Sequence, residues 1–212
     1  MTVLIGKKFK NGVLITGDKR ITYEATDSFN DDTKKVIKLN EKIILAYAGK
    51  KNIVDAVIDA LKEFATKNDS LEVVSSKSKE LFSIALKLFK ETYPNMAYST
   101  VYILAGLNDE NNEEPIVNYF SSDDFFQTSI PLGLLFYKTY PEEEMEKLES
   151  ILGDQVDFSQ NNIEYYVEQF SSIIRNMKSA KIGNTTYSIF LSKEGLYEFE
   201  SDENGEIQII QI

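Results

Sequence analysis

Four residues in the first quarter of the chain have side chains or positions that together could cleave an amide bond. Thr2 directly follows Met1, and Asp18, Lys35 and Gly49 stand beside apolar segments. An N-terminal threonine can use its own α-amine, whose ordinary pKa of about 7.7–8.0 lies near neutrality, as the base for its hydroxyl. This chemistry requires a free amine on Thr2 and therefore the removal of Met1, which the small second residue favours.

The other three residues could support a threonine nucleophile. A buried Lys35 would lower the pKa of the Thr2 hydroxyl and amine, and Asp18 would keep this lysine charged and oriented. Gly49 would offer its backbone N–H to an oxyanion, which requires close approach without a side chain. Each of these residues taken alone also has an ordinary structural explanation. The threonine would simply begin a strand, the aspartate would belong to a turn, the lysine would be solvated beside Lys34, and the glycine would precede a helix. We expect catalysis because the four occur together.

The composition excludes several other kinds of site. The chain contains no His and no Cys, which excludes the usual zinc sites and Ser-His-Asp or Cys-His catalysis, so we expect no metal and no cofactor. A formal charge of −11 repels nucleic acid and anionic membranes. Neither an apolar run of about 20 residues nor a signal-peptide pattern occurs. Together with the lack of cysteine, this predicts a cytoplasmic protein.

The pattern of apolar residues predicts strands, two helices, strands, helices and strands. Expected strands cover 3–9, 13–16, 35–39, 42–48, 100–107, 116–120, 125–130, 185–192, 196–200 and 207–210. One expected helix begins at Asn52. Further helices are expected over 75–93, over 132–152 with an interruption near Pro141, and over 162–178. The acidic stretch 108–114 is expected to be a solvated hairpin loop. Strands in blocks and helices in pairs indicate an α+β fold with two facing antiparallel sheets, each covered by helices, in a single domain over 1–212.

Two segments of the sequence, TVLIGKKFKNGVLITGDKR and TKKVIKLNEKIILAYAG, resemble the first third of a proteasome β subunit and of the HslV peptidase. The matching positions are the N-terminal threonine, an Asp-x-Arg turn, a lysine before an apolar strand and a glycine before a long helix. In this sequence they are Thr2, Asp18, Arg20, Lys35 and Gly49. One extra residue in the loop 21–33 lets Lys34 compete for the lysine position, and Lys35 is preferred because it directly precedes Val36.

The resemblance covers residues 2 to 65 and implies the four-layer αββα sandwich of N-terminal-nucleophile hydrolases. It also implies a threonine peptidase or amidohydrolase that forms an acyl-enzyme at Thr2 with a peptide or protein substrate. The expected assembly is a homo-oligomer, and a ring is one form that the resemblance implies. Arg20 is expected to brace the turn or the strand of Thr2.

Two later parts of the family pattern are missing. The stretch 128–133 lacks the family's Gly-Ser-Gly, whose serine assists the nucleophile, so Ser129 is only the nearest equivalent. Ser179, with Asn176 close by, stands where the family has an aspartate before the last strands. Two alternatives therefore stay open: a catalytically silent proteasome-like subunit for assembly or binding, and an acyl-transferring peptide ligase. Proteasome-related peptide ligases have a similar opening, with a single threonine and a Gly-Asp-x-Arg turn. The aromatic pairs 125–126 and 136–137 are expected at a subunit contact.

Overall fold

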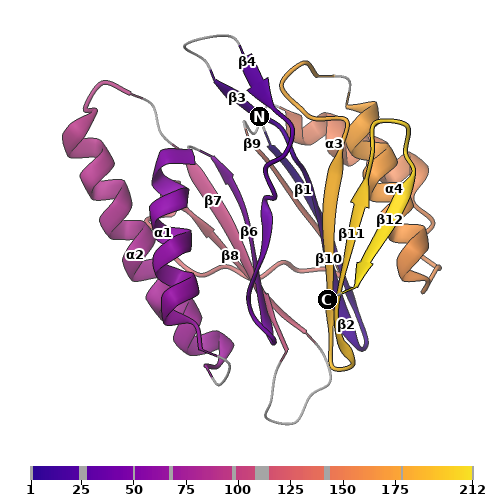
Figure 1. Cartoon of the computed structure of the whole chain (residues 1–212), viewed down its shortest axis with the longest axis horizontal. Helices are drawn as coiled ribbons and strands as arrows, with labels where there is room; N and C mark the ends of the chain where they lie inside the picture. Colours follow the sequence, from indigo (N-terminus) through magenta and orange to yellow (C-terminus); the bar gives the residue numbers. More distant parts are fainter. Residues whose placement is uncertain are drawn as a thin grey trace.

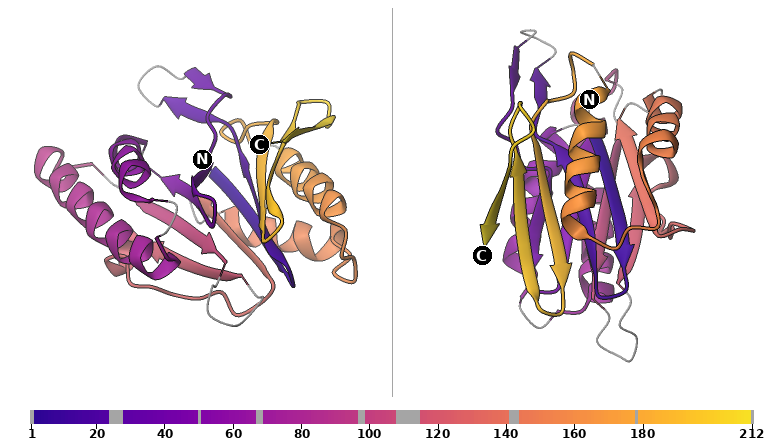
Figure 2. Two further views of the ribbon diagram at one scale, coloured as in Figure 1. Left: turned by 60° about the horizontal axis from the view of Figure 1, so that its bottom comes forward. Right: turned by 90° about the vertical axis from the view of Figure 1, so that its right-hand side faces the viewer.

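The fold consists of two antiparallel sheets that face each other, with helices on both outer faces (Figure 1). The computed structural model describes residues 2–23, 28–49, 51–66, 69–96, 99–107, 115–140, 144–177 and 179–211. Figure 2 shows the same arrangement tilted by 60° and, on the right, with the right-hand side of Figure 1 toward the viewer. The sequence predicts this α+β sandwich of four layers.

The first sheet has six strands in the order β12-β11-β10-β2-β1-β9. Its strands are β1 (Thr2–Phe9), β2 (Gly12–Asp18), β9 (Leu135–Tyr140), β10 (Thr186–Ser192), β11 (Gly195–Ser201) and β12 (Ile207–Gln211). The expected Asn-Gly turn joins β1 to β2, where Phe9 pairs with Gly12. Because β2 and β9 flank β1, the first residues of the chain are held on both sides.

The second sheet has four strands in the order β5-β6-β7-β8. Its strands are β5 (Val36–Asn40), β6 (Ile43–Gly49), β7 (Thr100–Gly106) and β8 (Ile116–Ser121), and a 3-10 turn, η1 (Ser122–Asp124), follows β8. A short hairpin of β3 (Ile21–Tyr23) and β4 (Ser28–Asn30) projects from the end of the sandwich where β1 begins (Figure 1).

Four helices form the outer layers. α1 (Lys51–Phe64) and α2 (Leu71–Thr92) cover the second sheet, and α3 (Met145–Gln155) and α4 (Ile163–Asn176) cover the first (Figure 1). α2 begins four residues earlier than expected because the Ser70 side chain accepts a hydrogen bond from the Val73 N–H. In the part of the chain that the structure describes, no helix is both long and apolar enough to cross a membrane.

Alternation along the strands divides the apolar residues into three cores, one between the two sheets and one beneath each pair of helices. Between the sheets lie residues such as Leu4, Ile15, Ala46, Ile103 and Ile189. The opposite face of β1 contributes Val3, Ile5 and Phe9 to the core beneath α3 and α4. Successive side chains of β1 therefore point to opposite faces, which places odd-numbered residues on the helix side and even-numbered ones between the sheets.

The region between β8 and α3 differs from the sequence prediction. Residues 135–140 of the expected helix 132–152 form β9, and α3 begins only at Met145. β9 pairs along β1 from Leu135 to Tyr140, so it fills a sheet edge that β1 would otherwise leave open. Its Leu-Phe-Tyr-Lys-Thr-Tyr sequence, rich in aromatic and β-branched residues, suits a strand.

The expected strand 125–130 is also wrong. Phe125 and Phe126 have positive φ angles of 56° and 57°, and only Ser129 of this stretch makes a β-bridge. Phe126 and Phe136 are buried within the chain, so the expectation that they mark a subunit contact is wrong, whereas Phe125 is exposed. The expected acidic loop 108–114 lies outside the described residues.

Candidate active site

Asp18, the last residue of β2, is completely buried and accepts hydrogen bonds at both carboxylate oxygens. Its Oδ1 accepts from the Val3 N–H and from Lys35 Nζ, each at 2.9 Å. Its Oδ2 accepts from Lys35 Nζ at 2.9 Å and from the backbone N–H groups of Arg20 at 3.1 Å and Gly183 at 3.3 Å. A buried carboxylate is tolerated when it is paired and hydrogen-bonded in this way.

Lys35 directly precedes β5 and is 3% exposed. Its ammonium contacts both oxygens of Asp18, which ends β2 of the first sheet. Burial lowers the pKa of Lys35, and the carboxylate of Asp18 opposes that change. The fully buried carboxylate of Asp18 therefore helps to hold this cation in place.

Thr2 is the first residue of β1 and is 5% exposed. It shares the inter-sheet face of β1 with Leu4, and it pairs with Tyr140 of β9. The next residue, Val3, donates its N–H to the same Asp18 oxygen that accepts from Lys35. The chain start and the buried ion pair thus meet at one carboxylate. Met1, whose removal the sequence analysis requires, lies outside the described residues.

Gly49 ends β6, two residues before α1 begins. Its φ is +131°, and a Cβ at this position would lie 2.4 Å from the Ser99 carbonyl oxygen. Both features require glycine. β6 packs against β1 across the inter-sheet core, so Gly49 belongs to the layer that faces the strand of Thr2. Its role as an oxyanion donor stays a prediction.

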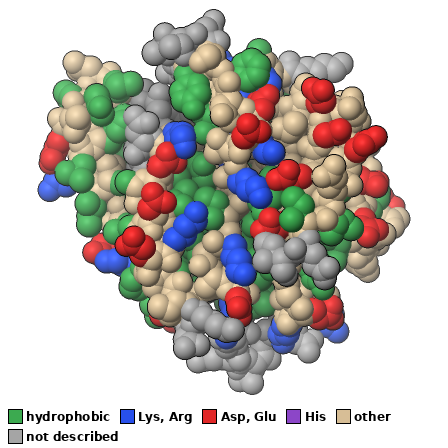
Figure 3. Space-filling view, viewed as in Figure 1, with side chains coloured by type: hydrophobic (Ala, Val, Ile, Leu, Met, Phe, Trp, Pro, Cys, Tyr) green, Lys and Arg blue, Asp and Glu red, His purple; other side chains and the backbone are tan. Residues whose placement is uncertain are grey.

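The two lysines that compete in the sequence are separated clearly. The Lys34 side chain is 44% exposed and pairs with Glu198 at 3.6 Å and Glu200 at 3.5 Å. Its ammonium also lies 4.1 Å from the centre of the Tyr187 ring. Figure 3 shows basic side chains along the middle of the face seen in Figure 1, with acidic side chains on both sides of them. Lys35, and not Lys34, therefore contacts Asp18.

Arg20 ties the turn after β2 to its surroundings. Its guanidinium makes two hydrogen bonds of 2.7 Å to the Asp31 carboxylate and one of 2.9 Å to the Ala180 carbonyl. It also lies 4.0 Å from the centre of the Phe29 ring on β4. The arginine lowers the pKa of Asp31 below its ordinary value. These contacts fasten the β3–β4 hairpin and the segment before β10 around Asp18.

Ser129 is not brought to this site by any described contact. It is exposed, and its backbone pairs with Tyr119 of β8 through bonds of 2.7 and 3.0 Å. At Ser179, where the family has an aspartate, the carbonyl accepts from the Ile182 N–H. An assisting role for Ser129 stays a prediction.

The sequence alone did not predict that Gly183 contacts Asp18. Gly183 follows the turn after Ser179, and its N–H donates to Asp18 from a segment 165 positions later in the chain. A Cβ here would lie 3.0 Å from the Arg20 Cβ and 3.1 Å from the Arg20 nitrogen. The sequence shows this glycine shortly before the last block of strands, but nothing near it indicates that its partner is Asp18.

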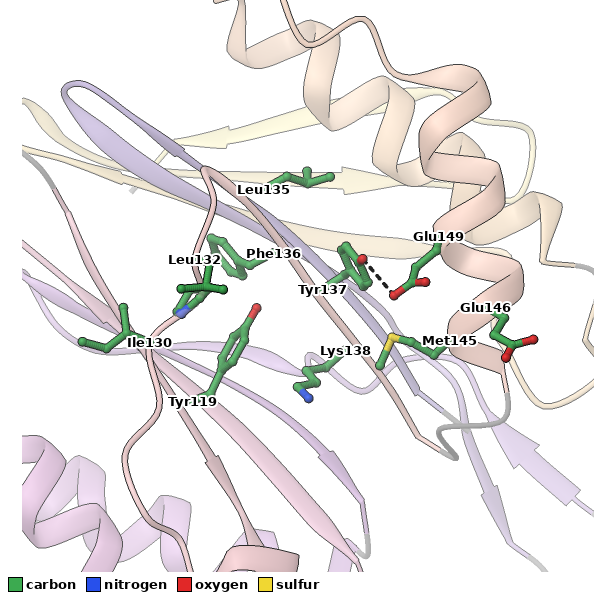
Figure 4. A pocket seen from close by; sticks show the side chains of 11 residues that line it. Tyr119, Ile130, Leu132, Leu135, Phe136, Tyr137, Lys138, Met145, Glu146 and Glu149 are labelled. Atoms are coloured by element: carbon green, nitrogen blue, oxygen red, sulfur yellow. Dashed lines mark hydrogen bonds between the residues drawn. The ribbon is translucent and has the colours of Figure 1, made fainter.

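A cavity of about 690 Å³ lies beside β9 (Figure 4). Tyr119, Ile130, Lys138 and Met145 are among its lining residues. On its α3 side the Tyr137 hydroxyl donates to Glu149 at 3.0 Å, the contact drawn as a dashed line in Figure 4. Thr2, Asp18 and Lys35 are not in its walls. Within the described ranges, no group of three or more acidic residues could hold a metal ion.

Two antiparallel sheets between helix layers, with a threonine at the start of an inner strand beside a buried Lys–Asp pair, define a fold of the N-terminal-nucleophile hydrolase type. The model of the proteasome subunit family matches residues 2–121, more than half of the sequence, and the chain therefore belongs to this family. The family is one of hydrolases of the peptidase kind. No curated protein sequence matches the chain.

Proposed function

We propose that this protein is a threonine peptidase or amidohydrolase whose nucleophile is the hydroxyl of Thr2, exposed by removal of Met1. The contacts of Asp18 carry the proposal, because one oxygen of this carboxylate binds both Lys35 Nζ and the N–H next to Thr2. A cation fixed at this position favours the ionised hydroxyl and the neutral amine that the reaction needs. The membership of the chain in the proteasome subunit family supports the same reaction class.

In the proposed reaction, the Thr2 hydroxyl oxygen attacks the carbonyl carbon of a peptide or amide bond. The hydroxyl proton moves to the α-amine of Thr2, and the oxyanion is stabilised by the Gly49 N–H. The carbon–nitrogen bond then breaks, and the amine returns the proton to the leaving nitrogen. Water attacks the resulting ester on Thr2, releases the acid and restores the hydroxyl.

The proposed context is that of the family. Subunits of the proteasome family generally assemble into rings, and we expect this chain to form a homo-oligomer that acts on peptide or protein substrates in the cytoplasm. Residues 1–212 would form a single domain, because each of the two sheets contributes to the core between them.

Two alternatives start from the same fold. A catalytically silent subunit is favoured by the exposed position of Ser129 and by the serine at position 179. A peptide ligase would use the same ester on Thr2 but pass the acyl group to an amine instead of water. The ligase differs from the hydrolase only in what attacks the ester.

The proposal is tested by intact-mass spectrometry of protein from its natural host, followed by reaction with a threonine-directed electrophile such as a peptide epoxyketone. We expect loss of the Met1 mass and a single covalent adduct on Thr2. Thr2→Ala should form no adduct and lose at least about 10³-fold in peptide hydrolysis, whereas Thr2→Ser should keep the adduct. Circular dichroism checks that both variants fold.

Three outcomes separate the alternatives. A chain that retains Met1 in its natural host and forms no adduct would establish the silent subunit. An adduct on Thr2 with hydrolysis of a fluorogenic peptide supports the peptidase. An adduct without hydrolysis, but with product formed when an amine acceptor is added, would replace the peptidase by the ligase.

A further inference from the structure

Lys7 is a second buried lysine, far from the candidate active site. It lies five residues after Thr2 on β1, roughly 17 Å along the strand. Its side chain belongs to the helix-facing side, in line with Val3, Ile5 and Phe9. Lys7 is only 5% exposed, although every neighbour on its face of the strand is apolar.

The contacts that the structure describes for Lys7 are with aromatic side chains. Its ammonium donates to the Tyr166 hydroxyl at 2.5 Å and lies 4.0 Å from the centre of the same ring. The ring of Phe9 is 5.4 Å away. Among the residues that the structure describes, no carboxylate forms an ion pair with Lys7. A buried cation held by a phenol and two ring faces lacks the partner that buried charges normally have.

Lys7 lines an open cavity, which we call the Lys7 pocket. The pocket has a volume of about 390 Å³ and is formed by Lys7, Lys8, Phe9, Lys10, Pro115, Leu134, Phe158 and Asn161. It is therefore bordered by β1, by the residues before β8 and β9, and by the segment between α3 and α4. This volume suits a small ligand.

The lining of the Lys7 pocket is basic and apolar. Among the described residues that line it, three of eight are lysines and none is acidic, in a chain whose formal charge is −11. Lys10 is exposed at the rim, where it can attract an anion from solution. Phe158 and Leu134 are 51% and 63% exposed, so they offer apolar surface to a ligand.

We propose that the Lys7 pocket binds an organic anion, a carboxylate carried on an apolar group, with the Lys7 ammonium as its ionic partner. An ammonium has three N–H donors, and Tyr166 accepts from one. A carboxylate with two oxygens suits the others. The apolar group would lie against Phe158 and Leu134. Such a carboxylate occurs both in a free acid and at the C-terminus of a peptide that ends in an apolar residue.

In the experiment, the protein is titrated with three probes, and NMR and calorimetry measure the binding. The probes are N-acetylphenylalanine, which resembles a peptide C-terminus, octanoate as a free acid, and N-acetylphenylalaninamide as the uncharged control. We expect saturable binding of at least one acid and at least about tenfold weaker binding of the amide. The acid that binds more tightly identifies the source of the carboxylate, a peptide end or a free acid.

Variants connect the binding to the pocket. Lys7→Met should weaken binding of the acid at least about tenfold, and Lys87→Met, which changes an exposed lysine on α2, should leave it unchanged. Phe158→Ala should weaken binding several-fold, and because its side chain is half exposed this variant tests the pocket even if Lys7→Met does not fold.

Three results would overturn the proposal. The first is no saturable binding of either acid by the wild type. The second is equal affinity for N-acetylphenylalanine and its amide. The third is tight binding of inorganic phosphate with none of either acid, which would show an anion site without the apolar part.

Discussion

Lys35 and Lys7 are both buried along the sheets of this protein, and their charges are accommodated differently. Lys35 contacts both oxygens of Asp18, and three backbone N–H groups complete the hydrogen bonding of that carboxylate. Lys7 donates to a phenol and lies against aromatic rings. The first cation belongs to a closed ionic network that fixes the chain start. The second has no carboxylate partner among the described residues, and the proposed ligand would supply one.

The largest expected effect comes from breaking the closed network. Asp18→Asn removes the carboxylate that accepts two hydrogen bonds from the buried Lys35, so the free energy of unfolding should fall by about 3–5 kcal/mol. Chemical denaturation monitored by circular dichroism measures the loss.

Lys34→Met is the control, because it removes the neighbouring lysine, whose side chain is 44% exposed, from ion pairs with Glu198 and Glu200. This control should cost less than Asp18→Asn, about 1 kcal/mol, because the Lys34 ammonium keeps much of its contact with water. If Asp18→Asn costs no more than Lys34→Met, the difference drawn between the two lysines is wrong.

An intermediate effect is expected at the phenol that Lys7 contacts. Tyr166→Phe removes the acceptor of the Lys7 N–H and the hydroxyl near the carbonyls of Asp157 and Gln160, so it should cost about 1–3 kcal/mol. The same denaturation experiment on Lys7→Met/Tyr166→Phe should show a smaller loss relative to Lys7→Met, because no buried cation then remains.

Tyr165→Phe is the control for this prediction, since the Tyr165 hydroxyl accepts an exposed hydrogen bond from the Asp157 N–H. Strictly additive effects of Lys7→Met and Tyr166→Phe would show that the phenol does not stabilise the cation.

The smallest expected effect is a dependence on pH. Burial lowers the pKa of Lys7 from its ordinary value of 10.5, so the unfolded chain binds more protons between the two values. The cost of burying the charge is complete below the folded-state pKa and is lost as the pH rises to 10.5. The wild type should therefore gain stability relative to Lys7→Met as the pH is raised toward 10.5. A stability difference that is constant from pH 8 to 10.5 would contradict this, and a comparison by urea denaturation measures it.

The sequence indicated much of the fold and the first part of the site. Asn11-Gly12, the alternating strands and the paired helices were sufficient for the four layers. The spacing of Thr2, Asp18 and Lys35 was informative because these residues flank strands whose pairing is local. β9 was missed because its apolar residues also fit a helix, and only the open edge of β1 decides between the two structures.

Long-range contacts explain the remaining differences. Gly183 donates to Asp18 across 165 positions, and the sequence near either residue does not show this. Lys7 stands in a stretch with other lysines, where it reads as one of several solvated charges. Its burial depends on Tyr166 of α4, a partner 159 positions away.

The hydrogen bond from Val3 to Asp18 has a consequence for the proposed removal of Met1. Because the donor is the amide of Val3 and not the amine of Thr2, the bond is the same whether or not a residue precedes the threonine. The ion pair and the first strand can therefore assemble in a precursor, and trimming the amino end would expose a reactive group in a scaffold that is already folded. Activation would then be a matter of covalent processing alone, separate from any refolding.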